Sequence, residues 1–482
     1  MMKAEIFRAL NASVKVGGQM ILRNVNISLN QGETLGIFGT FDSGKTLLLD
    51  MIAGTVKLDD GLLFYNDKLY LNSDANPPDI KIAQISRNSS LIDGLQLWKN
   101  IFVVRNHRRK KFFLSKKIII EELKKHFRDF NLNLDPNQLA GTLTPIEKVI
   151  VEILKAHLLN VKIILLNDFS SDFSAYECDR LYSFMRKLKN LGISFVMNSY
   201  RISNLKMLAD KISFISDGSI VKTIKNDAAK NSKNVDRVLS AIFPYELNHP
   251  KISTENEGVV FQAEDMDIGL KENLSFNLKK GEIVAFIDPY RKSLNLLEKR
   301  LRICDKESKF LLNGKQIYKF GWDKKIIFMD FSEKDTIFSS LSIINNLCFT
   351  NYKKISFLGI IRGGVCNFIS DEFEKWYGND SLTNELYQDN ISQAQRTAIL
   401  LFRLRLSNPD VLFCLDPELE SDIVNHKMIR SELNELAYGR GKSIFILTSN
   451  KDSIINFADR YIAVTENSDF EEHRIDKINY AV

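Results

Sequence analysis

The residues with the clearest chemical potential are in the run 32–46, GETLGIFGTFDSGKT. Gly39, Gly44, Lys45 and Thr46 in this run have the spacing Gly-x-x-x-x-Gly-Lys-Thr. Glycine lets backbone N–H groups approach a phosphate chain closely, while Lys45 supplies a charge to the β- and γ-phosphates and Thr46 a hydroxyl to Mg²⁺. An apolar strand precedes the loop and an apolar helix follows it, which is the context that a phosphate-binding loop requires.

The elements around this loop are predicted to form a mainly parallel sheet. Short apolar runs within 19–38 and at 80–86, 161–166 and 193–197 are separated by helical segments, including an amphipathic helix around 176–191. Buried strands that alternate with helices are typical of a parallel sheet covered on both faces. We therefore predict an α/β fold, and the second half shows the same alternation with apolar runs at 283–286, 326–329, 411–415 and 444–447.

The chain repeats itself. Gly32 and Gly281 hold the same place in two similar runs that are 249 positions apart. Two further pairs of runs, VKIILLND with DVLFCLDP and ADKISFIS with ADRYIAVT, match at the same offset. This offset is the length of one α/β domain and is far too long for a solenoid repeat. We therefore predict two homologous domains in tandem, residues 1–235 and 236–482, joined within the polar stretch 225–256.

The composition narrows the class of protein. The chain has 482 residues, a net charge of +6 and 26% charged residues, so it is expected to be an ordinary globular protein without a special preference for nucleic acid. Its five cysteines are scattered without metal-ligand or redox spacing, which predicts free thiols in a reducing compartment. We find no signal-peptide core and no apolar run that could span a membrane, so membrane contact is expected to be peripheral.

The order of motifs resembles that of an ABC ATPase. A phosphate loop, a helical insert, a signature stretch, a Walker B strand and a Ser-led switch occur in this order in both halves. The duplication within one chain is most similar to the tandem ATPase subunits of bacterial ribose-, galactose- and xylose-type sugar importers. This resemblance implies an internal pseudo-dimer of two nucleotide-binding domains that face each other head to tail.

The same resemblance implies cofactors, partners and a location. Each ATP, with Mg²⁺, would lie between the Walker A of one domain and the signature of the other, and ATP would close the dimer. Closure would drive integral-membrane permease subunits and, through them, serve a solute-binding protein. The chain would then be cytoplasmic, peripheral on the inner face of the cell membrane.

The first half keeps the family's Walker A and changes its catalytic motifs. The Walker B pair, normally Asp-Glu, is Asn167-Asp168. Asn167 would help Thr46 to hold the metal ion through its water shell, and Asp168 would act on the attacking water. Tyr200 replaces the switch histidine and cannot play the part of an imidazole at neutral pH. The implied nucleotide contacts on this side are Gly39, Asp42, Ser43, Gly44, Lys45, Thr46 and Leu47.

Two other first-half motifs also depart from the family. In the signature, Thr144 keeps a hydroxyl, but Pro145 removes a backbone donor and Ile146 loses the close approach that glycine permits. Arg87 stands where the family has the glutamine of its Gln loop. Gln84, three residues earlier, could substitute for it only if the loop shifts.

The second half departs further at its phosphate loop. Asp288 and Pro289 replace the glycines, and the loop looks about two residues short. Pro289 lacks an N–H donor and Asp288 would repel phosphate. Arg291 and Lys292 remain as cations without a cradle.

The remaining second-half motifs are mixed. The signature keeps Ser392 and has Ala394 in place of a glycine. The Walker B Asp is kept as Asp416, but Pro417 takes the place of the catalytic Glu. Asn450 is expected at the switch position.

Head-to-tail pairing would join the intact Walker A to the better signature, so one ATP would lie mainly between Lys45 and Thr46 on one side and Ser392 and Ala394 on the other. The losses at the first-half Walker B and switch positions predict slow turnover or none, because phosphoryl transfer depends on positioned charges. The leading hypothesis is the ATP-binding subunit of a sugar-type importer, and the alternative is a regulatory pseudo-ATPase with little or no hydrolysis. An ABC protein acting on nucleic acid is disfavoured by the near-neutral charge and by the absence of a clear basic stripe.

Overall fold

The computed structural model divides into two compact units, Met1–Pro244 and Tyr245–Val482. Among the residues that the structure describes, no helix has the length and apolarity needed to cross a membrane. The described residues are 4–70, 80–86, 88–102, 115–167, 173, 175–226, 232–242, 258–303, 309–318, 326–331, 337–338, 340–357, 360–361, 363–378, 393–417, 422–450, 454 and 457–474.

A six-stranded sheet forms the centre of the first unit, in the order β10-β9-β3-β8-β7-β6. All neighbouring strands are parallel except β10, which pairs antiparallel with β9. The predicted parallel sheet is therefore confirmed. Its strands are β3 (Thr34–Phe38), β6 (Ile82–Ser86), β7 (Ile163–Asn167), β8 (Ser194–Ser199), β9 (Lys211–Ser216) and β10 (Ser219–Lys225).

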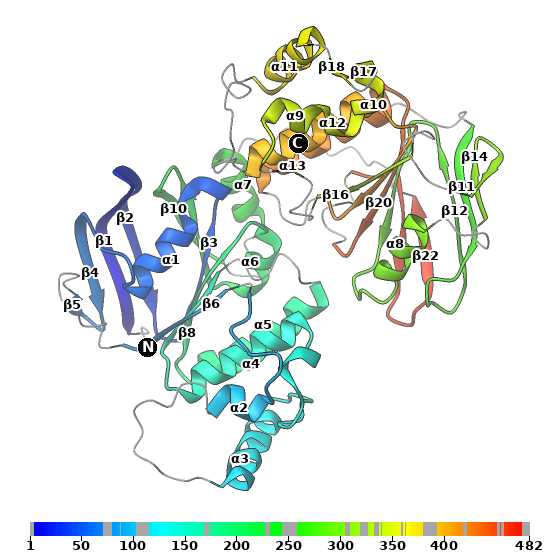
Figure 1. Cartoon of the computed structure of the whole chain (residues 1–482). Helices are drawn as coiled ribbons and strands as arrows, with labels where there is room; N and C mark the ends of the chain where they lie inside the picture. Colours follow the sequence, from blue (N-terminus) through cyan, green and yellow to red (C-terminus); the bar gives the residue numbers. More distant parts are fainter. Residues whose placement is uncertain are drawn as a thin grey trace. The chain divides into compact units, whose positions relative to one another are not determined.

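A second, antiparallel sheet covers one face of the first unit, with α1 (Lys45–Ala53) packed between the two sheets (Figure 1). Leu48, Leu49 and Ile52 of α1 belong to the buried cluster that joins the sheets. The sequence did not predict most of this sheet, because the only strand-like runs recognised near it were those within 19–38, before the phosphate loop. Its strands are β1 (Glu5–Val16), β2 (Gln19–Asn30), β4 (Asp60–Tyr65) and β5 (Lys68–Tyr70).

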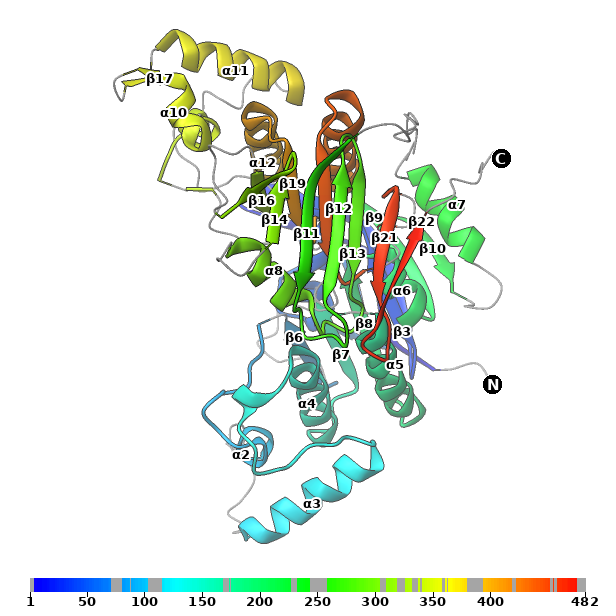
Figure 2. The same cartoon turned by 90° about the vertical axis from the view of Figure 1, so that its right-hand side faces the viewer.

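Helices α4 (Pro145–Leu158), α5 (Ala175–Asn190) and α6 (Ile202–Leu208) contribute to the hydrophobic cluster on the opposite face of the parallel sheet. The helical insert before α4 contains α2 (Leu97–Phe102) and α3 (Lys116–Asp129). Helix α3 lies at the end of the insert that is farthest from the sheet (Figures 1 and 2). A last helix, α7 (Ser232–Ile242), follows β10.

The second unit has the same two sheets. Its six-stranded sheet has the order β16-β19-β20-β13-β21-β22, and its antiparallel sheet has the order β12-β11-β14-β15. The strands are β11 (Val259–Met266), β12 (Leu274–Lys279), β13 (Ile283–Ile287), β14 (Lys309–Leu312), β15 (Lys315–Ile317), β16 (Ile326–Asp330), β19 (Val411–Leu415), β20 (Ser443–Thr448), β21 (Arg460–Val464) and β22 (Phe470–Arg474). Strand for strand, this is the topology of the first unit.

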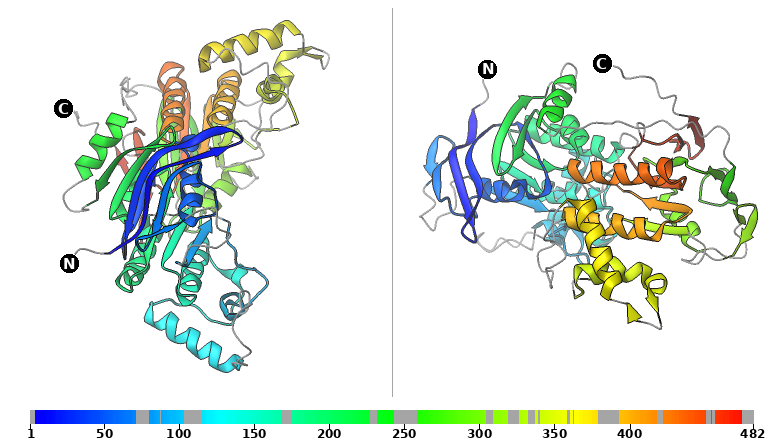
Figure 3. Two further views of the ribbon diagram at one scale, coloured as in Figure 1. Left: turned by 90° about the vertical axis from the view of Figure 1, so that its left-hand side faces the viewer. Right: turned by 90° about the horizontal axis from the view of Figure 1, so that it is seen from above.

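Helix α8 (Leu294–Arg302) packs against the antiparallel sheet of the second unit, and α12 (Gln393–Ser407) and α13 (Ile423–Asn434) cover the opposite face. The insert contains α9 (Ile343–Cys348), α10 (Tyr352–Ile355) and α11 (Gly363–Tyr377), with a short hairpin of β17 (Ser356–Phe357) and β18 (Ile360–Ile361). Helix α11, drawn in yellow, lies outside α12 and α13 (Figures 1 and 3).

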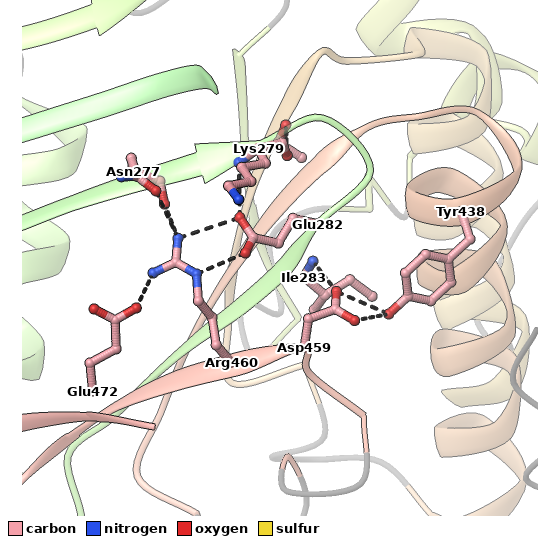
Figure 4. Close-up of polar contacts among 9 residues, drawn as sticks. Asn277, Lys279, Glu282, Ile283, Tyr438, Asp459, Arg460 and Glu472 are labelled. Carbon is pink, nitrogen blue, oxygen red and sulfur yellow. Dashed lines mark hydrogen bonds and ion pairs between the residues drawn. The ribbon is translucent and has the colours of Figure 1, made fainter. Parts of the chain in front are cut away.

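A buried ionic network fixes β21 in the second unit (Figure 4). The Arg460 guanidinium donates through Nε to Glu282 Oε1 at 2.8 Å and through one terminal nitrogen to Glu472 Oε1 at 2.5 Å. Its other terminal nitrogen donates to the backbone carbonyl of Asn277. Burial alone lowers the pKa of Arg460, but the bonds and charges of Glu282 and Glu472 outweigh it and raise that pKa.

Candidate phosphate-binding site

The first phosphate loop connects β3 to α1 through a short 3-10 turn at Phe41–Ser43. A Cβ atom at Gly39 would lie 2.5 Å from the carbonyl oxygen of Ile215 and 2.7 Å from Ser43 Oγ, so only glycine fits there. Gly44 has φ +88°, a conformation that glycine adopts without strain. The two glycines that were predicted as a phosphate cradle are therefore required by the loop's own geometry.

Lys45 is buried, with 2% of its surface exposed, although it carries a charge. Its ammonium donates to the Gly39 carbonyl at 2.8 Å and to the Thr40 carbonyl. It also contacts Ser43 Oγ at 3.4 Å, and Ser43 Oγ itself donates to the Thr40 carbonyl at 2.7 Å. The loop thus folds around the ammonium of Lys45 and holds it at the start of α1.

Thr46 and Leu47 follow on the first turn of α1. Thr46 is exposed and Leu47 is half-buried. The position of Thr46 suits a hydroxyl that binds a metal ion beside the phosphates. The side chain of Asp42, a further predicted nucleotide contact, lies outside the described part of the structure.

An aromatic pair closes over Lys45. The Tyr200 ring centroid lies 4.1 Å from Lys45 Nζ, which is a cation–π contact. The same ring lies 4.1 Å from the ring of Phe41, with 31° between the planes. The structure therefore brings the predicted switch residue Tyr200 to the phosphate loop, but it does so through its aromatic ring.

Phe41 was missed as a site residue. The sequence did contain a hint of this contact, because the phosphate loop has an aromatic residue, Phe41, and the switch position has another, Tyr200. Their pairing depends on two side-chain directions from distant segments, and the residue pattern alone does not give those directions.

The Walker B position lies beside the same loop, since β7, β8 and β3 are neighbours and end at one edge of the sheet. Asn198 Nδ2 donates to Asn167 Oδ1 at 2.8 Å, so the Asn167 amide is oriented by the strand next to it. The sequence pattern did not assign a role to Asn198. Asp168, the predicted catalytic carboxylate, lies outside the described residues.

The signature segment of the first unit caps its own helix. Thr144 Oγ1 accepts from the N–H of Glu147 at 3.4 Å, and Glu147 Oε2 accepts from the N–H of Thr144 at 3.0 Å, which together form a capping box. Pro145 is the first residue of α4 and Ile146 is buried, with 2% exposed. The Thr144 hydroxyl and the start of α4 are thus already paired with each other.

Gln84 lies beside α1, where its Nε2 donates to Asp50 Oδ1 at 3.2 Å. Asp50 is on α1, one turn beyond Thr46. Arg87, predicted at the family's Gln position, lies outside the described residues.

The corresponding loop of the second unit has the same length, so the predicted shortening is wrong. Strand β13 ends at Ile287 and α8 begins at Leu294, each 249 positions after its counterpart in the first unit. Six residues connect strand and helix in both units. The sequence did not show that the two loops have equal length, because the second loop lacks the glycines by which the first loop is aligned.

The strand register also fixes the switch position of the second unit. Strand β3 pairs Phe38 with Ser199, and β13 pairs Ile287 with Thr448, so the residue that corresponds to Tyr200 is Ser449. The assignment of Asn450 was therefore one residue out of register. In the second signature, Ala394 lies half-buried in the first turn of α12, and Ser392 lies outside the described residues.

The chain is similar to known ABC transporter proteins. A family model described as ABC transporter matches residues 22–170. A putative ribose/galactose/methyl galactoside import ATP-binding protein of Halalkalibacterium halodurans is 25% identical over 466 residues, covering 93% of this chain and 87% of the relative. The ribose import ATP-binding protein RbsA of Caldanaerobacter subterraneus is 23% identical, covering 96% of this chain and 94% of the relative.

A nucleotide-free ATP-binding cassette from an ABC transporter aligns over its full length with 50% of this chain, at 20% identity and a TM-score of 0.43.

Proposed function

Since the chain is a tandem ABC ATPase homologous to ribose and galactose import ATP-binding proteins, we propose that it is the ATP-binding subunit of a sugar-type importer. The observation that carries the proposal is the first phosphate loop, where the backbone requires Gly39 and Gly44 and where the buried Lys45 donates to the Gly39 carbonyl. The names of the relatives give no support to the regulatory pseudo-ATPase that the altered motifs left open.

The residues present fit the triphosphate of ATP. Glycine at position 39 lets the loop pack closely against Ile215 and Ser43 before it reaches α1, and the N-terminal end of α1 favours an anion. Lys45 is the positive group, and on phosphate binding its ammonium exchanges loop carbonyls for phosphate oxygens. Thr46 and Asn167 are the proposed metal-side residues, and Mg²⁺ would supply the charge that offsets the phosphates.

Turnover is proposed to be slow. Asn167 offers an amide where a charged carboxylate is usual, and Tyr200 presents a ring to Lys45 where the family has an imidazole. Loss of one stabilising catalytic group typically costs about 10²–10³ in rate. Asp168 stays the proposed group for the attacking water, and Ser392 and Ala394 stay the proposed contacts from the second signature.

The remaining proposals concern partners and location, and they rest on the resemblance to sugar importers. The chain would dock on integral-membrane permease subunits at the cytoplasmic face and serve a solute-binding protein through them. It would act as an internal pseudo-dimer and would not bind nucleic acid.

Thermal unfolding of the full chain with and without Mg·ATP tests the nucleotide part. A ligand that binds only the folded state at 100-fold excess over its Kd contributes about 2.7 kcal/mol. We expect a rise in Tm that disappears in Lys45→Ala. The matched control is Lys292→Ala, which removes a loop cation from the second unit and should leave the rise unchanged. The absence of any shift at millimolar ATP would contradict the proposed site.

Co-purification tests the import part. The tagged chain, expressed in its own host, is expected to bring a permease with it from detergent-solubilised membranes. Recovery of the chain from the soluble fraction alone would contradict this part.

A further inference from the structure

Asp288 holds the place in the second unit that Gly39 holds in the first. Both residues follow the central strand directly, and both precede the next helix by six positions. The first unit leaves no room for a side chain at this place, since a Cβ atom at Gly39 would lie 2.5 Å from the Ile215 carbonyl oxygen and 2.7 Å from Ser43 Oγ. In the second unit the carboxyl group of Asp288 is completely buried, with 0% exposed.

The Asp288 carboxylate binds the groups that a phosphate would bind. Its Oδ2 accepts from the N–H of Ser293 at 2.7 Å, from the Ser293 hydroxyl at 3.1 Å and from the N–H of Leu294 at 3.1 Å. Its Oδ1 accepts from the N–H of Tyr290 at 3.1 Å. Four donors from the loop and from the first residue of α8 therefore converge on one buried anion, at the positive end of the helix dipole.

The two cations of this loop are bound elsewhere. Lys292 Nζ donates to the carbonyl of Glu466 at 2.5 Å and to Ser468 Oγ at 3.1 Å. An Arg291 terminal nitrogen lies 3.5 Å from Ser449 Oγ. At the position of Lys45 the second unit has Leu294, which is buried in the hydrophobic core. The described contacts of both cations lie outside the donor set that Asp288 occupies.

We propose that Asp288 is a built-in anion that takes the place of a nucleotide phosphate at the start of α8. The second unit then holds its loop in a closed conformation without a nucleotide, and this loop does not bind a phosphate chain. Only the first unit is left to respond to ATP. The proposal does not depend on nucleotide binding by the first unit, because it concerns the second loop alone.

Chemical rescue tests this proposal in the full chain. All variants carry Lys45→Ala, so that the first loop gives no phosphate signal. Asp288→Ala should raise amide hydrogen exchange in the peptide 288–302 by about tenfold, since loss of a helix cap typically has an effect of this size. Millimolar inorganic phosphate, compared with chloride at equal ionic strength, should restore protection in Asp288→Ala and leave the chain with Asp288 unchanged.

The second unit provides a matched control in Asp422, which caps α13. Its Oδ1 accepts from the N–H groups of Val424 and Asn425 at 3.1 and 2.9 Å. Asp422→Ala should raise exchange at the start of α13, but phosphate should not reverse it, because the described donors to Asp422 are two N–H groups of α13, whereas a loop N–H and a hydroxyl also converge on Asp288. Rescue of both variants would show a general effect of phosphate and would overturn the proposal.

Asp288→Asn separates charge from size. This variant keeps an acceptor of similar shape, so a role for the anionic charge predicts raised exchange that phosphate partly reverses. Full protection in Asp288→Asn would overturn the proposal. If Asp288→Ala fails to fold, the chain with an intact Asp288 still decides the matter, because protection of 288–302 by phosphate or Mg·ATP would show an open loop.

Discussion

Glu33 of the first unit and Glu282 of the second lie 249 positions apart and make the same contacts. Glu33 Oε2 accepts from the N–H of Asn30 at 2.8 Å, and Glu282 Oε2 accepts from the N–H of Lys279 at 2.9 Å. Each carboxylate also pairs with the first cation of the neighbouring strand, Lys211 in one unit and Arg460 in the other.

The residue directly before each of these neighbouring strands repeats the pattern. Asp210 Oδ2 accepts from the N–H of Thr34 at 2.7 Å, and Asp459 Oδ2 accepts from the N–H of Ile283 at 2.9 Å. The polar contacts that hold the central strand were thus kept in both units while the phosphate loops diverged. The contrast teaches that the second unit keeps the scaffold of a nucleotide-binding domain and replaces its ligand with a carboxylate.

The ion pairs should give the largest difference between the units. Glu282→Ala leaves a buried arginine without its bidentate partner, and we expect the second unit to lose about 3–5 kcal/mol of stability. Glu33→Ala should cost the first unit less, about 1–3 kcal/mol, because the flexible stem of Lys211 can carry its ammonium to water. Calorimetric unfolding of the full-length variants measures both. Equal losses would contradict the view that the second unit depends more on its ionic network.

Two buried asparagines close equivalent insert loops. Asn100 Oδ1 accepts from the N–H of Ile92 at 2.9 Å, and Asn346 Oδ1 accepts from the N–H of Phe338 at 3.0 Å. Asn346 also accepts from the buried guanidinium of Arg403 at 2.8 Å, whose pKa burial lowers to about 10.

Replacing either asparagine with alanine should therefore cost about 2 kcal/mol, with a further loss in the second unit from the bond to a charged group. Hydrogen exchange of each loop gives the two values separately. A larger loss for Asn100→Ala would be inconsistent with these contacts.

The aromatic ring over Lys45 has no counterpart in the second unit, where Ser449 holds the position. Tyr200→Leu should destabilise the nucleotide-free chain by about 1 kcal/mol through the lost cation–π and ring contacts. Tyr200→Phe keeps the ring and should stay close to the parent in thermal unfolding. Ser449→Ala is the matched variant, with a change near zero. Equal Tm values for Tyr200→Leu and Tyr200→Phe would show that the ring contributes nothing.

The smallest expected effect depends on pH. Burial, followed by the charges of His126 and Lys162, lowers the pKa of His157 below its ordinary value of 6.5. The unfolded chain therefore binds the proton first, so the first unit should lose stability as the pH falls through about 6.5, until the folded state is protonated too. His157→Leu introduces the residue type found at the corresponding position of the second half, Leu406. It should flatten this part of the pH profile, and an unchanged profile would exclude His157 as the cause.

Much of the fold followed from residue patterns. The phosphate-loop spacing, the buried apolar runs of the parallel sheets and the repeat at 249 positions are properties of local sequence, and the structure confirms them. The antiparallel sheets were harder to predict, because their strands alternate, contain bulges and pair with partners that are distant in sequence. Non-local pairing of this kind is weakly encoded in any single segment.

The sequence predicted those site residues whose type and spacing are informative by themselves, but it did not predict contacts between residues. Lys45, Gly39 and Gly44 lie together in the loop between strand and helix that their spacing predicted. Asp288 was read as a group that repels phosphate, but its more specific role required the positions of the N–H groups around it. The contact between Phe41 and Tyr200 likewise depends on two side-chain conformations that the sequence does not show.

The number of nucleotides bound per chain tests the central contrast most directly. Equilibrium dialysis of the full chain with labelled ATP and Mg²⁺ is predicted to give one nucleotide per chain, and Lys45→Ala is predicted to give none. Two nucleotides per chain, or one that survives Lys45→Ala, would contradict the proposal that the first unit binds the nucleotide while Asp288 occupies the second loop.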